Sequence, residues 1–120
     1  MQRTVSSFAL HGLTSLISSV VRDNDDVTVV SLNYRLNIFG FPNAPQLDIA
    51  GKTQNFGLLD VDAAVQWVHD NIANFGGDPN RITLFGQSAG AYAIDAYAFA
   101  HPNDTIVKGM FGLVSSQSGI

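Results

Sequence analysis

The chain has 120 residues, of which 46% are hydrophobic, and carries a formal net charge of −4 with an isoelectric point near 4.9. This length is enough for one domain with its own core. The mild negative charge provides no basic surface, which argues against a nucleic-acid partner. The sequence has no cysteine, so it holds neither a disulfide framework nor a cysteine metal site.

The N-terminal region contains one moderately apolar stretch, residues 8–21, which His11 and several Ser and Thr residues interrupt. The stretch is too short and too polar to span a bilayer. It has the charge pattern of a poor signal peptide, but no clear small-x-small cleavage site follows it. The compartment therefore stays undetermined.

The first predicted elements are a strand and a long loop. Residues 27–32, Val-Thr-Val-Val-Ser-Leu, are rich in β-branched side chains and predict a buried strand. Residues 35–55 contain two prolines and two glycines without either helical or strand periodicity, which predicts a loop. Loops of this length often form the wall of a binding site.

An amphipathic helix is predicted next, because apolar residues recur at alternating spacings of three and four: Leu58, Val61, Val65, Val68, Ile72 and Phe75. Asp60 and Asp62 are expected in its first turn, where the helix dipole favours carboxylates. They lie two residues apart and do not face one another, so they are not an acid/base pair. Gly76, Gly77 and Pro79 predict the end of this helix.

The most informative motif is Gly86-Gln87-Ser88-Ala89-Gly90, which spells G-x-S-x-G. A β-rich run, residues 81–85, precedes it, and an alanine-rich helix former, residues 91–100, follows. Strand, sharp turn and helix form the context of a nucleophile elbow. Ser88 is thus the candidate nucleophile, and the Ala89 backbone N–H at the helix N-terminus is a candidate oxyanion donor. Side chains at Gly86 or Gly90 are expected to collide with the neighbouring strand or helix.

A last strand is predicted at residues 110–114. The order strand, helix, strand, helix, strand is typical of an α/β fold with a mostly parallel sheet and flanking helices.

Residues 75–90 resemble, without a gap, the serine signature of type-B carboxylesterases, a family that includes fungal lipases and cholinesterases. Residues 33–36, 39–41, 55–60, 66–68 and 118–119 are similar to further landmarks of this family, in the same order. Gln87, where many members have Glu, resembles the fungal branch. The resemblance implies an α/β-hydrolase fold that hydrolyses small-molecule carboxylic esters through an acyl-serine intermediate, without a metal or an organic cofactor. It carries over only Ser88 as nucleophile and Ala89 as oxyanion donor.

The resemblance divides the chain into a divergent N-terminal segment, residues 1–25, and the central part of a carboxylesterase domain, residues 26–120. It implies a fragment that lacks the N- and C-terminal strands of the fold, and with them the acid and the histidine of the triad. The family's Gly-Gly-Gly oxyanion loop has no clear counterpart, and His11-Gly12 is the nearest match. Unless residues 5–10 supply a strand between those at 27–32 and 81–85, the sheet has a gap.

Two polar residues that follow Ser88 in the chain are too far from it to complete a catalytic triad. Asp95 and His101 follow Ser88 in the order of a triad, but along a helix they lie roughly 10 Å and nearly 20 Å away. A base must come within about 3 Å of the serine oxygen. Asp95 either pairs with Arg35 or lies at an exposed edge.

Two further residues are expected to have no role in catalysis. His69 falls on the polar side of its helix and is expected to be solvated. Trp67 is expected to pack into the core against the sheet rather than to line a ligand pocket.

The leading hypothesis is a nucleophile-bearing piece of a serine carboxylesterase that is inactive alone. The alternatives are a catalytically inactive or non-catalytic carboxylesterase-like protein, and a different α/β hydrolase such as a thioesterase or peptidase. Many family members are secreted, and residues 103–105, Asn-Asp-Thr, form an N-glycosylation sequon that matters only in a secreted chain.

Overall fold

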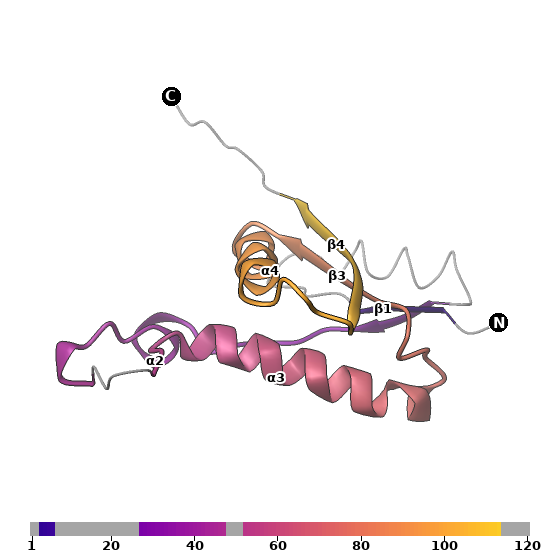
Figure 1. The fold of residues 1–120 in the computed structure, drawn as a ribbon, viewed down its shortest axis with the longest axis horizontal. Coiled ribbons are helices and arrows are strands. Elements are labelled where there is room, and N and C mark those ends of the chain that lie inside the picture. Colours follow the sequence, from indigo (N-terminus) through magenta and orange to yellow (C-terminus); the bar gives the residue numbers. More distant parts are fainter. Residues whose placement is uncertain (1–2, 7–26, 48–51, 114–120) are drawn as a thin grey trace.

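A computed structural model describes residues 3–6, 27–47 and 52–113 (Figure 1). The elements follow in the order β1 (Arg3–Ser6), β2 (Val27–Val30), α2 (Asn37–Gly40), η1 (Pro45–Leu47), α3 (Phe56–Asn71), η2 (Ile72–Phe75), β3 (Ile82–Gln87), α4 (Ala89–Ala100) and β4 (Val107–Leu113). Their alternation confirms the predicted α/β class. The apolar stretch 8–21, His11-Gly12 and residues 118–119 lie outside the described residues.

The described strands form two parallel pairs, β1–β2 and β3–β4. Val5 lies opposite Val29 in the first pair, and Leu84 lies opposite Met110 in the second. β1 also lies beside β3 (Figure 1), so an N-terminal strand lies between β2 and β3, but β1 and β3 belong to separate two-stranded sheets. This strand covers residues 3–6 rather than 5–10.

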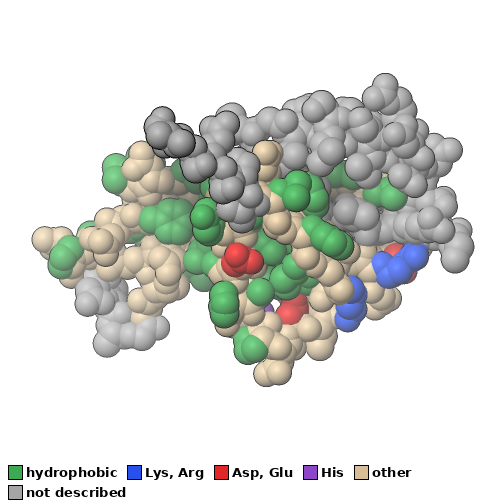
Figure 2. Space-filling view, turned by 90° about the horizontal axis from the view of Figure 1, so that it is seen from above, with side chains coloured by type: hydrophobic (Ala, Val, Ile, Leu, Met, Phe, Trp, Pro, Cys, Tyr) green, Lys and Arg blue, Asp and Glu red, His purple; other side chains and the backbone are tan. Residues whose placement is uncertain are grey.

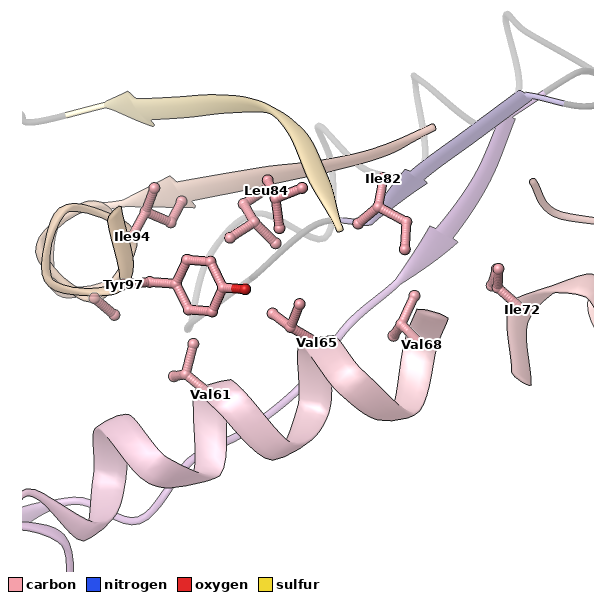
Figure 3. Packing of buried hydrophobic residues seen from close by; sticks show 10 residues of the cluster. Val61, Val65, Val68, Ile72, Ile82, Leu84, Ile94 and Tyr97 are labelled. Carbon is pink, nitrogen blue, oxygen red and sulfur yellow. The ribbon is translucent and has the colours of Figure 1, made fainter. Parts of the chain in front are cut away.

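The core lies between the strands and the helices α3 and α4, which are neighbours on one side of the strands (Figure 1). β3 alternates strictly, with Ile82 and Leu84 fully buried. Figure 3 shows Val61, Val65 and Val68 of α3 pointing toward these strand residues. Each such side chain contributes about 1.5–3 kcal/mol when it leaves water completely. The periodicity of α3 therefore predicted the correct face of this helix.

Three expectations about α3 are wrong in detail. The helix begins at Phe56, so Asp60 and Asp62 lie beyond its first turn, which contains no acidic residue. Phe75 is 65% exposed because η2 replaces the α-helical turn after Asn71 and breaks the 3.6-residue period. Trp67 is 50% exposed rather than a core residue. It precedes the buried Val68 by one residue and is therefore rotated about 100° away from it around the helix.

The predicted helix end is correct. Gly76 adopts a φ of 81°, in the left-handed region, and its N–H donates to the carbonyls of Ala73 and Ile72. A residue without a side chain reaches this conformation at no steric cost.

Apolar side chains remain exposed on α4 and β4: Tyr92, Phe99, Met110, Phe111 and Leu113. Figure 2 looks onto this side of the molecule, where hydrophobic side chains gather over the middle and the Lys and Arg side chains lie to one side. The described part of the chain thus leaves apolar surface open beside the candidate elbow.

Candidate active site

Ser88 lies at the turn between β3 and α4 in a conformation that serine rarely adopts. Its φ is 53° and its ψ is −117°, and it is one of three non-glycine residues with positive φ in the described part of the chain. The residue is exposed. Such strain persists only where surrounding contacts enforce it, and it often marks a functional position.

Backbone hydrogen bonds from both neighbouring elements hold this turn. The Ser88 N–H donates to the Leu113 carbonyl at the end of β4, at 2.8 Å. The Ser88 carbonyl accepts from the N–H groups of Ala91, at 2.9 Å, and Tyr92, at 3.2 Å, in the first turn of α4. Because both backbone groups of Ser88 are bound, the strained conformation is fixed at the end of the strand.

Gly86, two residues before Ser88, has to be a glycine because β3 and α4 approach each other closely at this point. A Cβ on Gly86 would lie 2.5 Å from the carbonyl carbon and oxygen of Gly90 and 2.9 Å from the Ala91 nitrogen. This is the collision expected for a side chain at position 86, whereas the expectation for Gly90 stays a prediction. Gly86 and Gly90 are both buried, whereas Gln87, the last residue of β3, is half-buried.

Ala89 is the first residue of α4, and its N–H has no acceptor within the helix because the first N–H groups of a helix lack one. It is exposed next to Ser88. Its role as an oxyanion donor remains a prediction.

An open apolar hollow borders this end of α4; it is lined by Tyr34, Leu36, Asn37, Phe41, Leu58, Ala89, Tyr92, Ala93 and Ala96. The Tyr34 hydroxyl donates to the Ala89 carbonyl at 3.5 Å. Burial raises the pKa of Tyr34, so this hydroxyl keeps its proton at neutral pH. The loop expected to wall a binding site thus lines a hollow beside the elbow.

One ion pair holds the loop in place, and its partner differs from the expected one. Arg35 donates from Nη2 to Oδ1 of Asp60 at 2.7 Å, and from Nε and the backbone N to Oδ2 at 2.8 Å and 2.9 Å. The hydrogen bond from Arg35 lowers the pKa of Asp60. Asp95 is exposed on α4, so the alternative of an exposed edge is correct for it.

A close backbone contact supports the same loop. A Cβ on Gly57 would lie 2.5 Å from the Arg35 carbonyl oxygen and 2.6 Å from the Phe41 ring. The loop therefore packs directly on the first turn of α3.

The two described histidines have partners away from the elbow. His101 follows the far end of α4, where its Nδ1 lies 3.0 Å from the Tyr97 carbonyl and its Nε2 lies 3.7 Å from Asp62. His69 is on α3 with its Nδ1 3.1 Å from Asp70, and its side chain is 38% exposed, in agreement with the expected position on the polar side of the helix. Within the described residues, therefore, no histidine is placed to act on Ser88.

The partners of Arg35 and Tyr34 could not be predicted from the sequence, because both contacts join residues at least 25 positions apart.

Across residues 3–6, 27–47 and 52–113, no group of three His, Cys, Asp or Glu side chains could hold a metal ion. In the same ranges no helix is long and apolar enough to cross a membrane.

The fold and the site define an α/β protein that presents a strained serine between a parallel strand and a helix. The sequence profile of the Carboxylesterase family matches residues 6–119. The chain belongs to this family.

Three relatives illustrate the match. Secreted lipase 5 of Gibberella zeae is 57% identical over 82 residues, which are 68% of this chain and 15% of that protein. Chlorogenic acid esterase of Aspergillus niger is 56% identical over 82 residues, with the same coverages of 68% and 15%. Carboxylesterase 3B of Mus musculus is 46% identical over 107 residues, which are 89% of this chain and 18% of that protein. The chain therefore spans 15–18% of the length of these relatives.

Proposed function

We propose that this chain carries the nucleophile elbow of a carboxylic ester hydrolase that works through an acyl-serine intermediate, with Ser88 as the nucleophile. The observation that carries the proposal is the backbone of Ser88, whose φ of 53° and ψ of −117° are held between β3 and α4. Membership of the carboxylesterase family and relatives named as a lipase, a chlorogenic acid esterase and a carboxylesterase support the same chemistry.

In the proposed reaction a base takes the proton of the Ser88 hydroxyl as its oxygen attacks the ester carbonyl. The Ala89 N–H, at the positive end of α4, stabilises the oxyanion that forms. The alcohol then leaves, and water releases the acid from the serine. Neither described histidine is placed for this step, so the base comes from elsewhere in the complete enzyme.

The substrate proposed is a small-molecule carboxylic ester with an apolar group near the scissile bond. The hollow beside Ala89 is lined mainly by aliphatic and aromatic side chains, with the Tyr34 hydroxyl among them. Sites for small molecules are typically apolar with a few polar groups that fix orientation.

The first test treats the 120-residue chain and its Ser88→Ala variant with a fluorophosphonate probe and reads the intact masses. We expect no adduct on either chain, because loss of a triad member leaves only weak residual catalysis. An adduct confined to the chain with Ser88 would show that a base is assembled within this chain, against the expectation.

The second test supplies the base. The segment of the Gibberella zeae lipase that matches this chain is replaced by the corresponding residues of this chain, and the chimera is treated with the same probe. We expect labelling and ester hydrolysis that Ser88→Ala abolishes. A folded chimera that leaves Ser88 unlabelled would favour the alternative, a non-catalytic carboxylesterase-like protein. Higher rates on thioesters or peptides than on short-chain esters would favour a different hydrolase.

A further inference from the structure

The turn between α4 and β4 carries the single N-x-Ser/Thr tripeptide of the sequence, Asn103-Asp104-Thr105. Asn103 and Thr105, the two residues that define such a tripeptide, are exposed, and Asp104 between them is half-buried. None of these residues takes part in the proposed ester hydrolysis.

The hydrogen bonds of the Asp104 side chain hold this residue inward, while Asn103 and Thr105 on either side of it are exposed. Its Oδ1 accepts from the Ile106 N–H at 2.8 Å, and its Oδ2 accepts from the Val107 N–H at 3.1 Å. The Tyr97 hydroxyl of α4 donates to the same Oδ2 at 2.9 Å. The middle side chain of the tripeptide is thus turned toward the body of the protein and anchors the turn to both flanking elements.

The backbone of the turn is held as well. The Asp104 N–H donates to the His101 carbonyl at 3.1 Å, and the Lys108 ammonium donates to the Thr105 carbonyl. The turn is therefore a defined surface feature that carries the exposed Asn103. A large group attached there would leave these anchoring contacts intact.

The turn is also remote from the candidate elbow. Ser88 precedes the first residue of α4, whereas Asn103 follows the last residue of this 12-residue helix. At 1.5 Å per residue the helix separates the two sites by about 18 Å. An attachment on Asn103 would project from the end of α4 that faces away from Ser88.

From this geometry we propose that Asn103 is an acceptor for an N-linked oligosaccharide when the chain is in the lumen of a secretory pathway. The Nδ2 nitrogen of Asn103 forms a bond to the anomeric carbon of a polyprenyl-diphosphate-linked oligosaccharide. The bond from that carbon to the diphosphate oxygen breaks, the polyprenyl diphosphate leaves with the electron pair, and Nδ2 releases one proton. The Thr105 hydroxyl supplies the recognition element of the tripeptide. This proposal is independent of the ester chemistry.

The test translates the 120-residue chain behind a cleavable secretory leader in the presence of microsomes. A flexible tail with a second N-x-Thr tripeptide is appended after Ile120, so that its glycan reports import in every sample. The wild-type chain is compared with Asn103→Gln, with Thr105→Ala, and with the matched control Thr105→Ser, which keeps the tripeptide functional.

We expect two glycan steps on a gel for the wild type and for Thr105→Ser, and one step for Asn103→Gln and Thr105→Ala. An endoglycosidase should bring all four chains to the same mobility. A wild-type chain that gains only the step of the appended tail would overturn the proposal. So would a second step that persists in Asn103→Gln.

Discussion

The substitution Gly86→Ala tests whether β3 and α4 approach each other as closely as the structure places them. The added Cβ would lie 2.5 Å from the Gly90 carbonyl and 2.9 Å from the Ala91 nitrogen. These are backbone atoms, so no rotation of a side chain relieves the contact. Among the described glycines only Gly76 has a positive φ, so the backbone of Gly86 is in a region that alanine also adopts. Alanine at position 86 therefore adds a steric penalty without a conformational one.

The magnitude follows from the displacement. The closest contact has to lengthen from 2.5 Å to the 3.4 Å at which ordinary contact begins, a separation of about 0.9 Å between β3 and α4. Overpacking of this kind typically costs about 1–3 kcal/mol. The same movement pulls on the 2.8 Å hydrogen bond from the Ser88 N–H to the Leu113 carbonyl. In the labelled chimera we therefore expect Gly86→Ala to slow labelling of Ser88 as well.

The assay is urea unfolding of the 120-residue chain followed by far-UV circular dichroism. A double-mutant cycle with Gly112 provides the control, since a Cβ there would meet the Ala91 side chain at 3.1 Å. Ala91→Gly should therefore relieve Gly112→Ala and leave Gly86→Ala unrelieved, which a coupling energy measures directly. Unfolding free energies of Gly86→Ala and the wild type that agree within error would refute the close approach.

Two further substitutions test the core and the α4–β4 turn. Leu84→Ala removes a side chain with 0% exposure and should destabilise the chain by about 2–5 kcal/mol, whereas Leu59→Ala, at 43% exposure, should stay within about 0.5 kcal/mol of the wild type in urea unfolding. Asp104→Ala leaves the buried Tyr97 hydroxyl without its acceptor and should cost about 1–3 kcal/mol, with a smaller loss for Asp104→Asn. Burial raises the pKa of Asp104, but hydrogen bonds from Ile106, Val107 and Tyr97 outweigh it and lower the pKa below its ordinary 3.8. The stabilisation by this carboxylate is hence complete above pH 3.8 and lost as the pH falls below it. A Leu84→Ala variant as stable as Leu59→Ala, or an Asp104→Ala penalty that persists unchanged in acid, would contradict these predictions.

The local features of the turn between β3 and α4 were predictable because their causes lie within a few residues. The β-rich run, the two glycines and the alanine-rich run each act on neighbouring backbone, and β3, the strained Ser88 turn and α4 follow in that order. The same holds for the helix end at Gly76, whose φ of 81° needs no distant contact.

Long-range pairing was not predictable in the same way. A charged side chain such as Arg35 has several carboxylates within reach of a flexible chain, and only the packing of its loop on α3 selects Asp60 over Asp95. The placement of an N-terminal strand beside β3 likewise depends on how the chain returns across the sheet.

By itself, the sequence determined the α/β alternation, the apolar face of α3 and the serine at a strand–helix turn, because periodicity and glycine placement act locally. The tertiary structure alone decided where side chains from distant parts of the chain lie relative to that serine and to the core. It brought Tyr34 to the Ala89 carbonyl, held His101 beside Asp62 at the far end of α4, and left Trp67 half-exposed. These outcomes depend on the relative rotation and spacing of packed elements, which interactions between distant residues set together.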